Sequence, residues 1–204
     1  VFFGPDSYRF AQLIEAHLQQ CPEPVRRVVD IGCGAGIGAL VVAHARPQAD
    51  VLAVDINPRA LRLSAVNAEL AQASNISAYH SDVLGSVEGL FDLIIANPPY
   101  MNDSQQRAYR HGGGVLGEAL SVRIVRESLP RLDKGGSLLL YTGVAMVAGT
   151  DPFLESIQPL LGDDRFTWTY RELDPDVFGE ELLKPGYERV ERIAVVALTV
   201  TRRY

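Results

Sequence analysis

The sequence predicts an α/β fold: a doubly wound, mostly parallel seven-stranded sheet with helices on both faces and an antiparallel final strand. Short apolar, β-branched runs alternate with helical patterns along the 204 residues, which favours right-handed crossovers between parallel strands. The run at 91–96 is almost wholly apolar, as expected of a strand that is buried on both faces. Prolines and glycines in 172–191 disfavour a helix there, so the last two strands are expected to pair antiparallel at one edge.

The expected elements follow from apolar periodicity and from turn residues. Strands are expected at 25–31, 51–54, 76–80, 91–96, 137–142, 166–170 and 193–201. Helices are expected from an N-cap at Asp6 or Ser7 to about Gln20, and over about 37–46, 58–72, 117–132 and 151–161. Asn57 is a typical N-cap and Pro58 a typical first helical residue, which supports the third helix. The glycine-rich segment 101–115 is expected to be a loop.

Length and composition fit one globular domain. The chain is long enough for a single core, and 47% apolar and 22% charged residues are ordinary values for a globular protein. No apolar run approaches the ~18 residues of a membrane-spanning helix, and no segment resembles a signal peptide. Together with only two cysteines, Cys21 and Cys33, these features indicate a cytoplasmic protein with reduced thiols and no membrane contact. Because the chain starts at Val1 and not at Met, we expect an upstream segment.

Charge and histidine placement bear on partners. The four histidines are scattered, without the spacing of a metal site, so no metal is expected. The net charge of −6 counts against bare nucleic acid as the whole substrate, although it does not exclude a local basic patch.

A glycine loop follows the first predicted strand, at the edge of the sheet where ligands bind in open α/β folds. It contains Gly32, Gly34 and Gly36, which let a ligand lie against the main chain, and Cys33, which is read as a small filler. Asp30 stands just before the loop and suits a positively charged part of a ligand better than a pyrophosphate. S-adenosylmethionine carries an ammonium and a sulfonium group, whereas NAD carries phosphates.

The next two strand ends carry carboxylates as well. Asp55 can accept hydrogen bonds from both hydroxyls of a ribose. Asp82, as an acceptor, and Val83, as an apolar wall, can bind an adenine. The spacing from Gly34 to Ala39 also fits the dinucleotide fingerprint loosely, so a nicotinamide-dependent oxidoreductase stays open as an alternative. A non-catalytic module that binds S-adenosylmethionine is the third hypothesis.

The fourth predicted strand runs into Asn97, Pro98, Pro99 and Tyr100. The Asn97 side-chain oxygen and the Pro98 carbonyl can accept the two N–H groups of a planar nitrogen and turn its lone pair toward a methyl donor. Neither proline has an N–H that would compete, and both stiffen the turn. Tyr100 can lie flat against a planar substrate group. These features predict methyl transfer to an amino or amide nitrogen.

These residues resemble the class I methyltransferases, specifically the small methyltransferase domain group with Asn-Pro-Pro-Tyr. That group includes HemK-like glutamine methyltransferases of release factors and RNA or DNA amino-methyltransferases. The resemblance rests on segments 29–36, 53–58, 91–100 and 132–136. It implies a Rossmann-like methyltransferase fold, S-adenosylmethionine as cofactor, and cofactor contacts from Ile56 and Asn97. The acceptor it implies is a protein glutamine amide or the exocyclic amino group of a nucleobase.

The same resemblance covers the start of the chain. Segment 3–8 matches the motif that precedes the sheet in the group, so Phe3 and Tyr8 are expected to screen the methionine end of the cofactor, with a hydrophobic staple as the alternative. Residues 1–24 would then form a helix over the cofactor side of a methyltransferase domain at 25–204.

The segment after the tetrapeptide departs from the release-factor enzymes, which carry a Glu-Pro pair before two glycines. Here Arg107, Arg110 and His111 precede the glycines and are candidates for contact with a phosphate or acidic substrate group. The acidic segment 172–191 should begin at the same sheet edge, where its negative charge would repel a long phosphate backbone.

Overall fold

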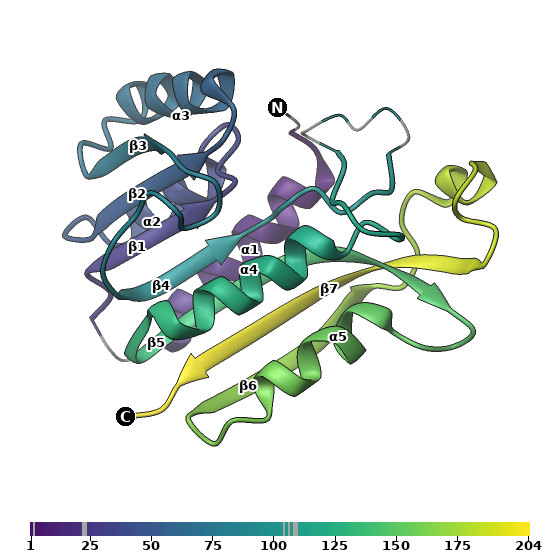
Figure 1. Ribbon diagram of the computed structural model, residues 1–204. Helices are drawn as coiled ribbons and strands as arrows, with labels where there is room; N and C mark the ends of the chain where they lie inside the picture. The colour runs from purple at the N-terminus through teal and green to yellow at the C-terminus, as the bar shows by residue number, and fades with distance from the viewer. Residues whose placement is uncertain (2, 22–23, 104, 106, 108–109) are drawn as a thin grey trace.

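Seven strands form a single sheet in the part of the chain that the computed structural model describes, residues 1, 3–21, 24–103, 105, 107 and 110–204 (Figure 1). The strands are β1 (Arg27–Ile31), β2 (Asp50–Asp55), β3 (Ile76–His80), β4 (Phe91–Ala96), β5 (Leu132–Val147), β6 (Phe166–Asp174) and β7 (Val190–Arg202). Their order is β3-β2-β1-β4-β5-β7-β6; β7 is antiparallel to both neighbours and the other pairs are parallel. The predicted doubly wound sheet with an antiparallel final strand is confirmed.

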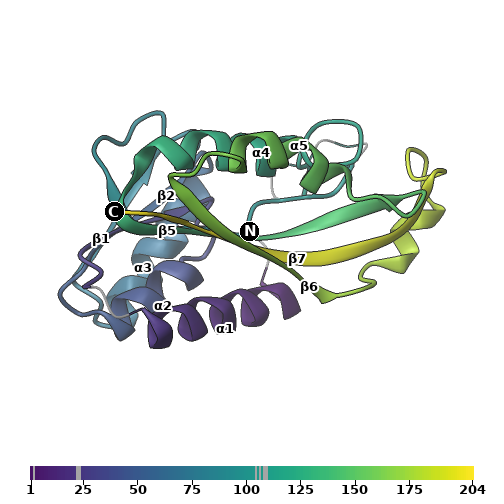
Figure 2. The ribbon, with the colours of Figure 1, turned by 90° about the horizontal axis from the view of Figure 1, so that it is seen from below.

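Helices cover both faces of this sheet. They are α1 (Pro5–Gln20), α2 (Ile37–Ala45), α3 (Pro58–Leu70), α4 (Ala119–Ser128) and α5 (Pro152–Leu161), with short 3-10 helices η1 (Leu129–Arg131) and η2 (Gly179–Leu183). Figure 2 shows α1, α2 and α3 on one face and α4 and α5 on the other. None of these helices, among the described residues, combines the length and the apolar character that crossing a membrane requires.

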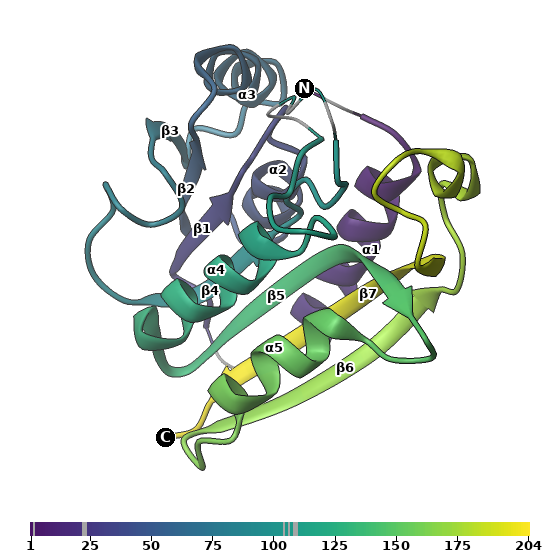
Figure 3. The ribbon, with the colours of Figure 1, turned by 45° about the vertical axis from the view of Figure 1, so that its right-hand side comes forward.

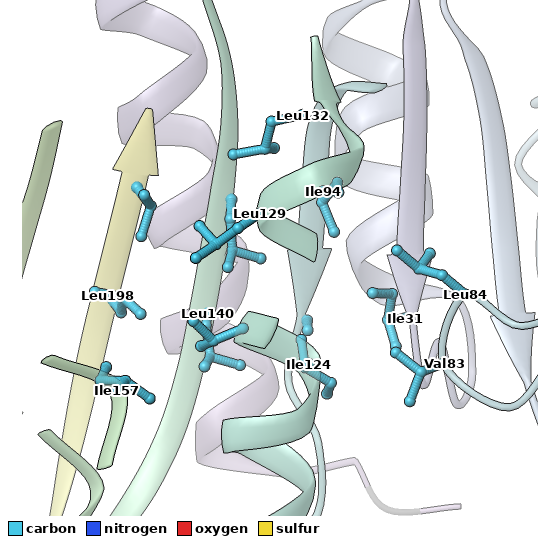
Figure 4. Packing of buried hydrophobic residues seen from close by; sticks show 14 of the residues in the cluster. Ile31, Val83, Leu84, Ile94, Ile124, Leu129, Leu132, Leu140, Ile157 and Leu198 are labelled. Atoms are coloured by element: carbon cyan, nitrogen blue, oxygen red, sulfur yellow. The ribbon is translucent and has the colours of Figure 1, made fainter. Parts of the chain in front are cut away.

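Each face of the sheet buries its own apolar cluster. In Figure 4, Ile124 of α4 and Ile157 of α5 lie over Leu140 of β5 and Leu198 of β7. On the opposite face, Ile14 and its apolar neighbours on α1 pack with α2 against β1, β4 and β5. The periodicity that predicted these helices therefore marks the stripes that face the sheet.

The element ends differ from the prediction where strand pairing decides them. β5 begins at Leu132, which pairs with Phe91 of β4, and continues to Val147 because it pairs with β7 from Ser137 onward. The predicted strand at 137–142 covers only the middle of β5, because Gly135, Gly136 and Gly143 flank that run and glycine disfavours strands. The predicted helix at 117–132 is shorter, and its last residues form η1, where Pro130 disfavours an α-helix.

The start of α1 also differs from the prediction. Its N-cap is Gly4, whose N–H donates to Ser7 Oγ (3.3 Å), while the Ser7 N–H donates to Gly4 O (2.9 Å). Asp6 is therefore not the cap, and its side chain points into the protein. Pro22 and Glu23, which follow α1, lie outside the described residues.

The strand order places a crevice at one edge of the sheet. The chain leaves β1 toward β2 and leaves β4 toward β5, so the connections after these two parallel neighbours lead to opposite sides of the sheet (Figure 3). Ligands bind in open α/β sheets at such a switch point, beyond the carboxyl ends of the strands.

Candidate active site

A cavity of about 230 Å³ lies at that switch point. Segments after four parallel strands line it: Ile31, Gly32 and Gly34 after β1, Asp55 to Asn57 after β2, Ser81 to Val83 after β3, and Asn97 to Met101 after β4. The start of α1 adds Asp6 and Ser7, and α4 adds Leu120 and Ile124. The predicted strand-end residues thus come together around one cavity.

The glycine loop forms the wall of the cavity after β1. Gly32 has a φ of +67°, and a Cβ there would meet no atom within 4 Å, so the main chain faces open space. Cys33 is buried beside it, and burial raises the pKa of its thiol, which fits the filler role. Its N–H donates to Val54 O (3.0 Å) and ties the loop to β2. Gly36 and Cys33 do not line the cavity.

Asp30 lies beneath the loop and not in the cavity lining. Its side chain is 2% exposed, and Oδ2 accepts the backbone N–H of Ala39 in α2 (2.9 Å). Burial raises the pKa of Asp30 to about 7, against the effect of that hydrogen bond. In this structure the carboxyl supports the turn from β1 into α2, and a direct contact with a ligand remains a prediction.

Asp55 joins two segments of the wall. Its Oδ2 accepts the N–H of Gly34 (3.1 Å) and its Oδ1 accepts the N–H of Asn57 (2.8 Å). A carboxylate has about four acceptor positions, so two remain for the hydroxyls of a ribose. Ile56, half exposed beside it, also lines the cavity.

The third strand end supplies a strained apolar residue. Val83 is buried and has a φ of +52°, a conformation that is costly for a β-branched side chain. Such strain persists where the surroundings enforce it, frequently at ligand sites. Asp82 also lines the cavity, and its carboxylate pairs with Arg123 of α4 (2.8 Å) at the solvent-exposed side.

The turn after β4 closes the cavity on the side opposite the glycine loop. Asn97 is half-buried, Pro98 is buried, and all four residues of the tetrapeptide line the cavity. Met101 directly follows the tetrapeptide and pairs with the glycine-rich loop through its main chain. Its N–H donates to Arg110 O, and its carbonyl accepts the N–H of Gly112 (3.0 Å each). The end of the turn is therefore tied to the glycine-rich loop.

Tyr100 is held by Asp6, which in turn binds Tyr141; the sequence predicted no role in the site for either residue. Its hydroxyl donates to Asp6 Oδ2 (2.5 Å), and the hydroxyl of Tyr141 in β5 donates to Asp6 Oδ1 (2.8 Å). Burial, and then the Asp6 carboxylate, raise the pKa of both tyrosines well above the usual range. The ring packs against Gly143 of β5 and is tilted against Phe178, at 6.3 Å between centroids.

The two arginines after the tetrapeptide form ion pairs with acidic residues. Arg107 binds Asp103 through two nitrogens (2.6 and 2.9 Å), and this pair holds the pKa of Asp103 well below its usual range. Arg110 lines the cavity and pairs with Glu181 of η2. His111 Nδ1 accepts the N–H of Asp103 (3.2 Å). Of the three candidates for substrate contact, only Arg110 reaches the cavity. Ala108 and Tyr109, which stand between Arg107 and Arg110 in the sequence, lie outside the described residues.

The architecture is that of solved methyltransferases. The structure resembles the ribosomal protein L11 methylase of Lactobacillus delbrueckii subsp. bulgaricus with a TM-score of 0.63, over 97% of this chain and 80% of that one, at 20% identity. It resembles the tRNA m1G37 methyltransferase of M. jannaschii with a TM-score of 0.65, over 100% of this chain and 52% of that one, at 18% identity. At these identities the likeness shows the fold.

The sequence decides the family. Residues 10–148 match the family model described as methyltransferase small domain. The chain belongs to this family.

Curated relatives of this small methyltransferase domain carry two kinds of name. The release factor glutamine methyltransferase of Koribacter versatilis is 32% identical over 82% of this chain, and that of Escherichia coli is 34% identical over 64% of it. The ribosomal RNA small subunit methyltransferase C of Shewanella amazonensis is 34% identical over 72% of it. These matches span 60%, 51% and 38% of the three relatives, so the chain covers less than two thirds of the length of each. The family favours methyl transfer over the nicotinamide-dependent alternative that the glycine spacing had left open.

The first turn of α1 shows the alternative role for two aromatic residues. Phe3 and Tyr8 pack edge to face at 5.3 Å between ring centroids, on either side of the helix start, which is the geometry of a hydrophobic staple. They are 54% and 60% exposed and do not line the cavity. Within the described part of the domain there is also no group of three or more potential metal ligands.

Proposed function

We propose that this small methyltransferase domain transfers a methyl group from S-adenosylmethionine to a planar amino or amide nitrogen. The observation that carries the proposal is that one cavity joins the glycine wall, Asp55 and the Asn97–Pro98 turn. Family membership supports use of this cofactor, and the residues of the wall fit it.

The wall offers one feature for each part of the cofactor. Gly32 leaves the main chain open to a ligand, Asp55 keeps acceptor positions for a ribose, and Val83 provides an apolar surface for a base, with Asp82 beside it. When bound, S-adenosylmethionine supplies a methyl group from its sulfonium sulfur. The rest of the cofactor is then the leaving group, a neutral thioether.

The turn after β4 would orient the acceptor. The Asn97 side-chain oxygen and the Pro98 carbonyl accept the two N–H groups of the acceptor nitrogen, which draws its lone pair out of conjugation. A neutral nitrogen attacks and loses its proton afterwards, so no strong base is needed before transfer. The contribution of this domain is then mostly orientation and fixed dipoles.

A side-chain amide of a protein is the acceptor that the chain supports best. Several relatives are named for methylation of a glutamine in release factors. Glu181 neutralises Arg110, the candidate for phosphate contact that reaches the cavity, and the net charge of −6 would oppose a long phosphate backbone. A nucleobase amino group, suggested by the ribosomal RNA relatives, is the alternative outcome of the test.

Two measurements test the proposal. Calorimetry with S-adenosylhomocysteine should show saturable binding, and its absence would remove the cofactor assignment. Radiolabelled methyl transfer to a cell lysate should then leave label that protease digestion releases and nuclease digestion does not. Nuclease-sensitive label would move the acceptor to RNA or DNA. Binding without transfer to any fraction would leave a non-catalytic binding module.

A further inference from the structure

Asp6 is a buried carboxylate at the cavity that the proposed mechanism does not use. It lies in the first turn of α1, is 6% exposed, and lines the cavity together with Tyr100. We infer that Asp6 is a positioning residue, which fixes the Tyr100 ring, and with it the Asn97–Pro98 turn, by accepting the Tyr100 hydroxyl. This inference rests on the proposed function for its effect on rate, but the contact itself is testable without it.

The ring of Tyr100 is confined from three directions. A Cβ on Gly143 would lie 2.2 Å from two ring carbons, so the ring fills the space that this glycine leaves. Phe178 limits it on another side, and Asp6 anchors its far end at 2.5 Å. Because the hydroxyl is engaged by Asp6, the ring is the part of Tyr100 that remains for a substrate.

Anchoring the ring also anchors the turn. Tyr100 directly follows Pro99, and the two prolines leave few rotatable bonds between the ring and the Asn97 side chain. A shift of the ring would therefore displace the two acceptor oxygens, and small displacements of orienting groups are costly for rate.

Asp6 is itself held by other elements. Tyr141 of β5 donates to its second oxygen (2.8 Å), and Arg9 lies 3.8 Å from that oxygen. Arg9 in turn binds Asp174 at the end of β6 (2.5 Å). Helix α1, β5 and β6 thus converge on the group that orients Tyr100.

The chain contains a matched pair away from the cavity. Tyr170 of β6 donates to Asp151 Oδ2 at 2.5 Å, and burial, then this contact, raise the pKa of Tyr170 as they do that of Tyr100. Neither Tyr170 nor Asp151 lines the cavity. Substitutions in this half-buried pair control for the loss of a tyrosine–aspartate hydrogen bond as such.

A double-mutant cycle tests whether Asp6 acts through Tyr100. Asp6→Ala should lower the methyl-transfer rate, at saturating S-adenosylmethionine and with the labelled lysate fraction, by about tenfold in the native background and by less than about twofold in a Tyr100→Phe background. S-adenosylhomocysteine affinity should change by less than about threefold. Asp151→Ala and Tyr170→Phe should leave the rate unchanged. Equal losses from Asp6→Ala in both backgrounds would overturn the inference.

Two further readouts keep the inference falsifiable. If Asp6→Ala does not fold, Tyr100→Phe alone must lower the rate while preserving S-adenosylhomocysteine affinity; an unchanged rate overturns the role. If the native protein transfers no methyl group, the proposed function fails, and NMR of protein labelled with ¹³C at tyrosine Cζ decides the contact separately. The Tyr100 resonance, assigned by its loss in Tyr100→Phe, should shift in Asp6→Ala and not in Asp151→Ala; no shift overturns the inference.

Discussion

The backbone N–H of Gly34 donates to Asp55 Oδ2 at 3.1 Å, which fastens the glycine loop to the end of β2. The same carboxylate accepts the N–H of Asn57 through its other oxygen. Its two oxygens are therefore fixed in direction by the main chain before any ligand binds, and their remaining acceptor positions border the cavity.

Replacing this carboxylate should weaken cofactor binding. We predict that Asp55→Ala raises the Kd for S-adenosylhomocysteine by about 10- to 100-fold, because hydrogen bonds to a charged group contribute about 1.5–3 kcal/mol. Calorimetry measures the change. Asp50→Ala, at the exposed opposite end of β2, is the control and should bind normally. Equal affinity of the two variants would remove Asp55 from the ribose site.

Asn97 should affect transfer far more than binding. We predict that Asn97→Ala abolishes measurable methyl transfer, since the side-chain oxygen that orients the acceptor is lost, while S-adenosylhomocysteine affinity changes by less than about threefold. Radiolabel transfer and calorimetry on the same preparation separate the two effects. A large loss of affinity would mean that Asn97 serves the cofactor and not the acceptor.

Each part of the site that the sequence predicted lies at the carboxyl end of its own strand. The glycine loop, Asp55 and the Asn97–Pro98 turn each follow a strand directly, so a parallel sheet brings them to one edge. The Asp6–Tyr100 contact joins residues that are 94 positions apart, and no local sequence pattern predicts it. Asp6 beside Pro5 has the pattern of a helix start, so the local sequence favours a cap at Asp6 over a contact with a distant strand end.

The local sequence also does not predict that the Asp30 side chain points toward α2. A carboxylate before a glycine loop can face the ligand or the helix that follows, and only the packing of α2 on β1 decides between them. The full length of β5 depends on its pairing with β4 at its start and with β7 from Ser137 onward, and both partners are distant in sequence. Pattern therefore specified the strand ends and their chemistry, whereas contacts between distant elements required the structure.

Asp30 should make stability depend on pH. Its pKa of about 7 in the folded protein lies above the value of about 3.9 in an unfolded chain, so the folded state binds this proton more tightly. Its favourable contribution is complete below about pH 4 and is lost as the pH rises through about 7. Asp30→Asn cannot ionise and should lose less stability over that range.

Urea denaturation of the native protein and Asp30→Asn at several pH values between 4 and 9 measures this difference. The free energy of unfolding of the variant, relative to the native protein, should rise up to about pH 7 and then level off. A difference that is constant with pH would show that Asp30 does not titrate in this window.

A methyl group at Gly143 should disturb the same tyrosine that orients the turn. The Cβ in Gly143→Ala would lie 2.2 Å from the Tyr100 ring, so the ring or β5 must shift. Overpacking of this kind costs about 1–3 kcal/mol, and the displaced ring should also lower the methyl-transfer rate. Gly162→Ala is the matched control, because its Cβ would meet no atom closer than 3.9 Å and its φ of −73° suits alanine. Thermal unfolding and initial rates of both variants test the prediction. If Gly143→Ala behaved like Gly162→Ala in both measurements, the tight fit of Tyr100 against β5 would have no role in stability or transfer.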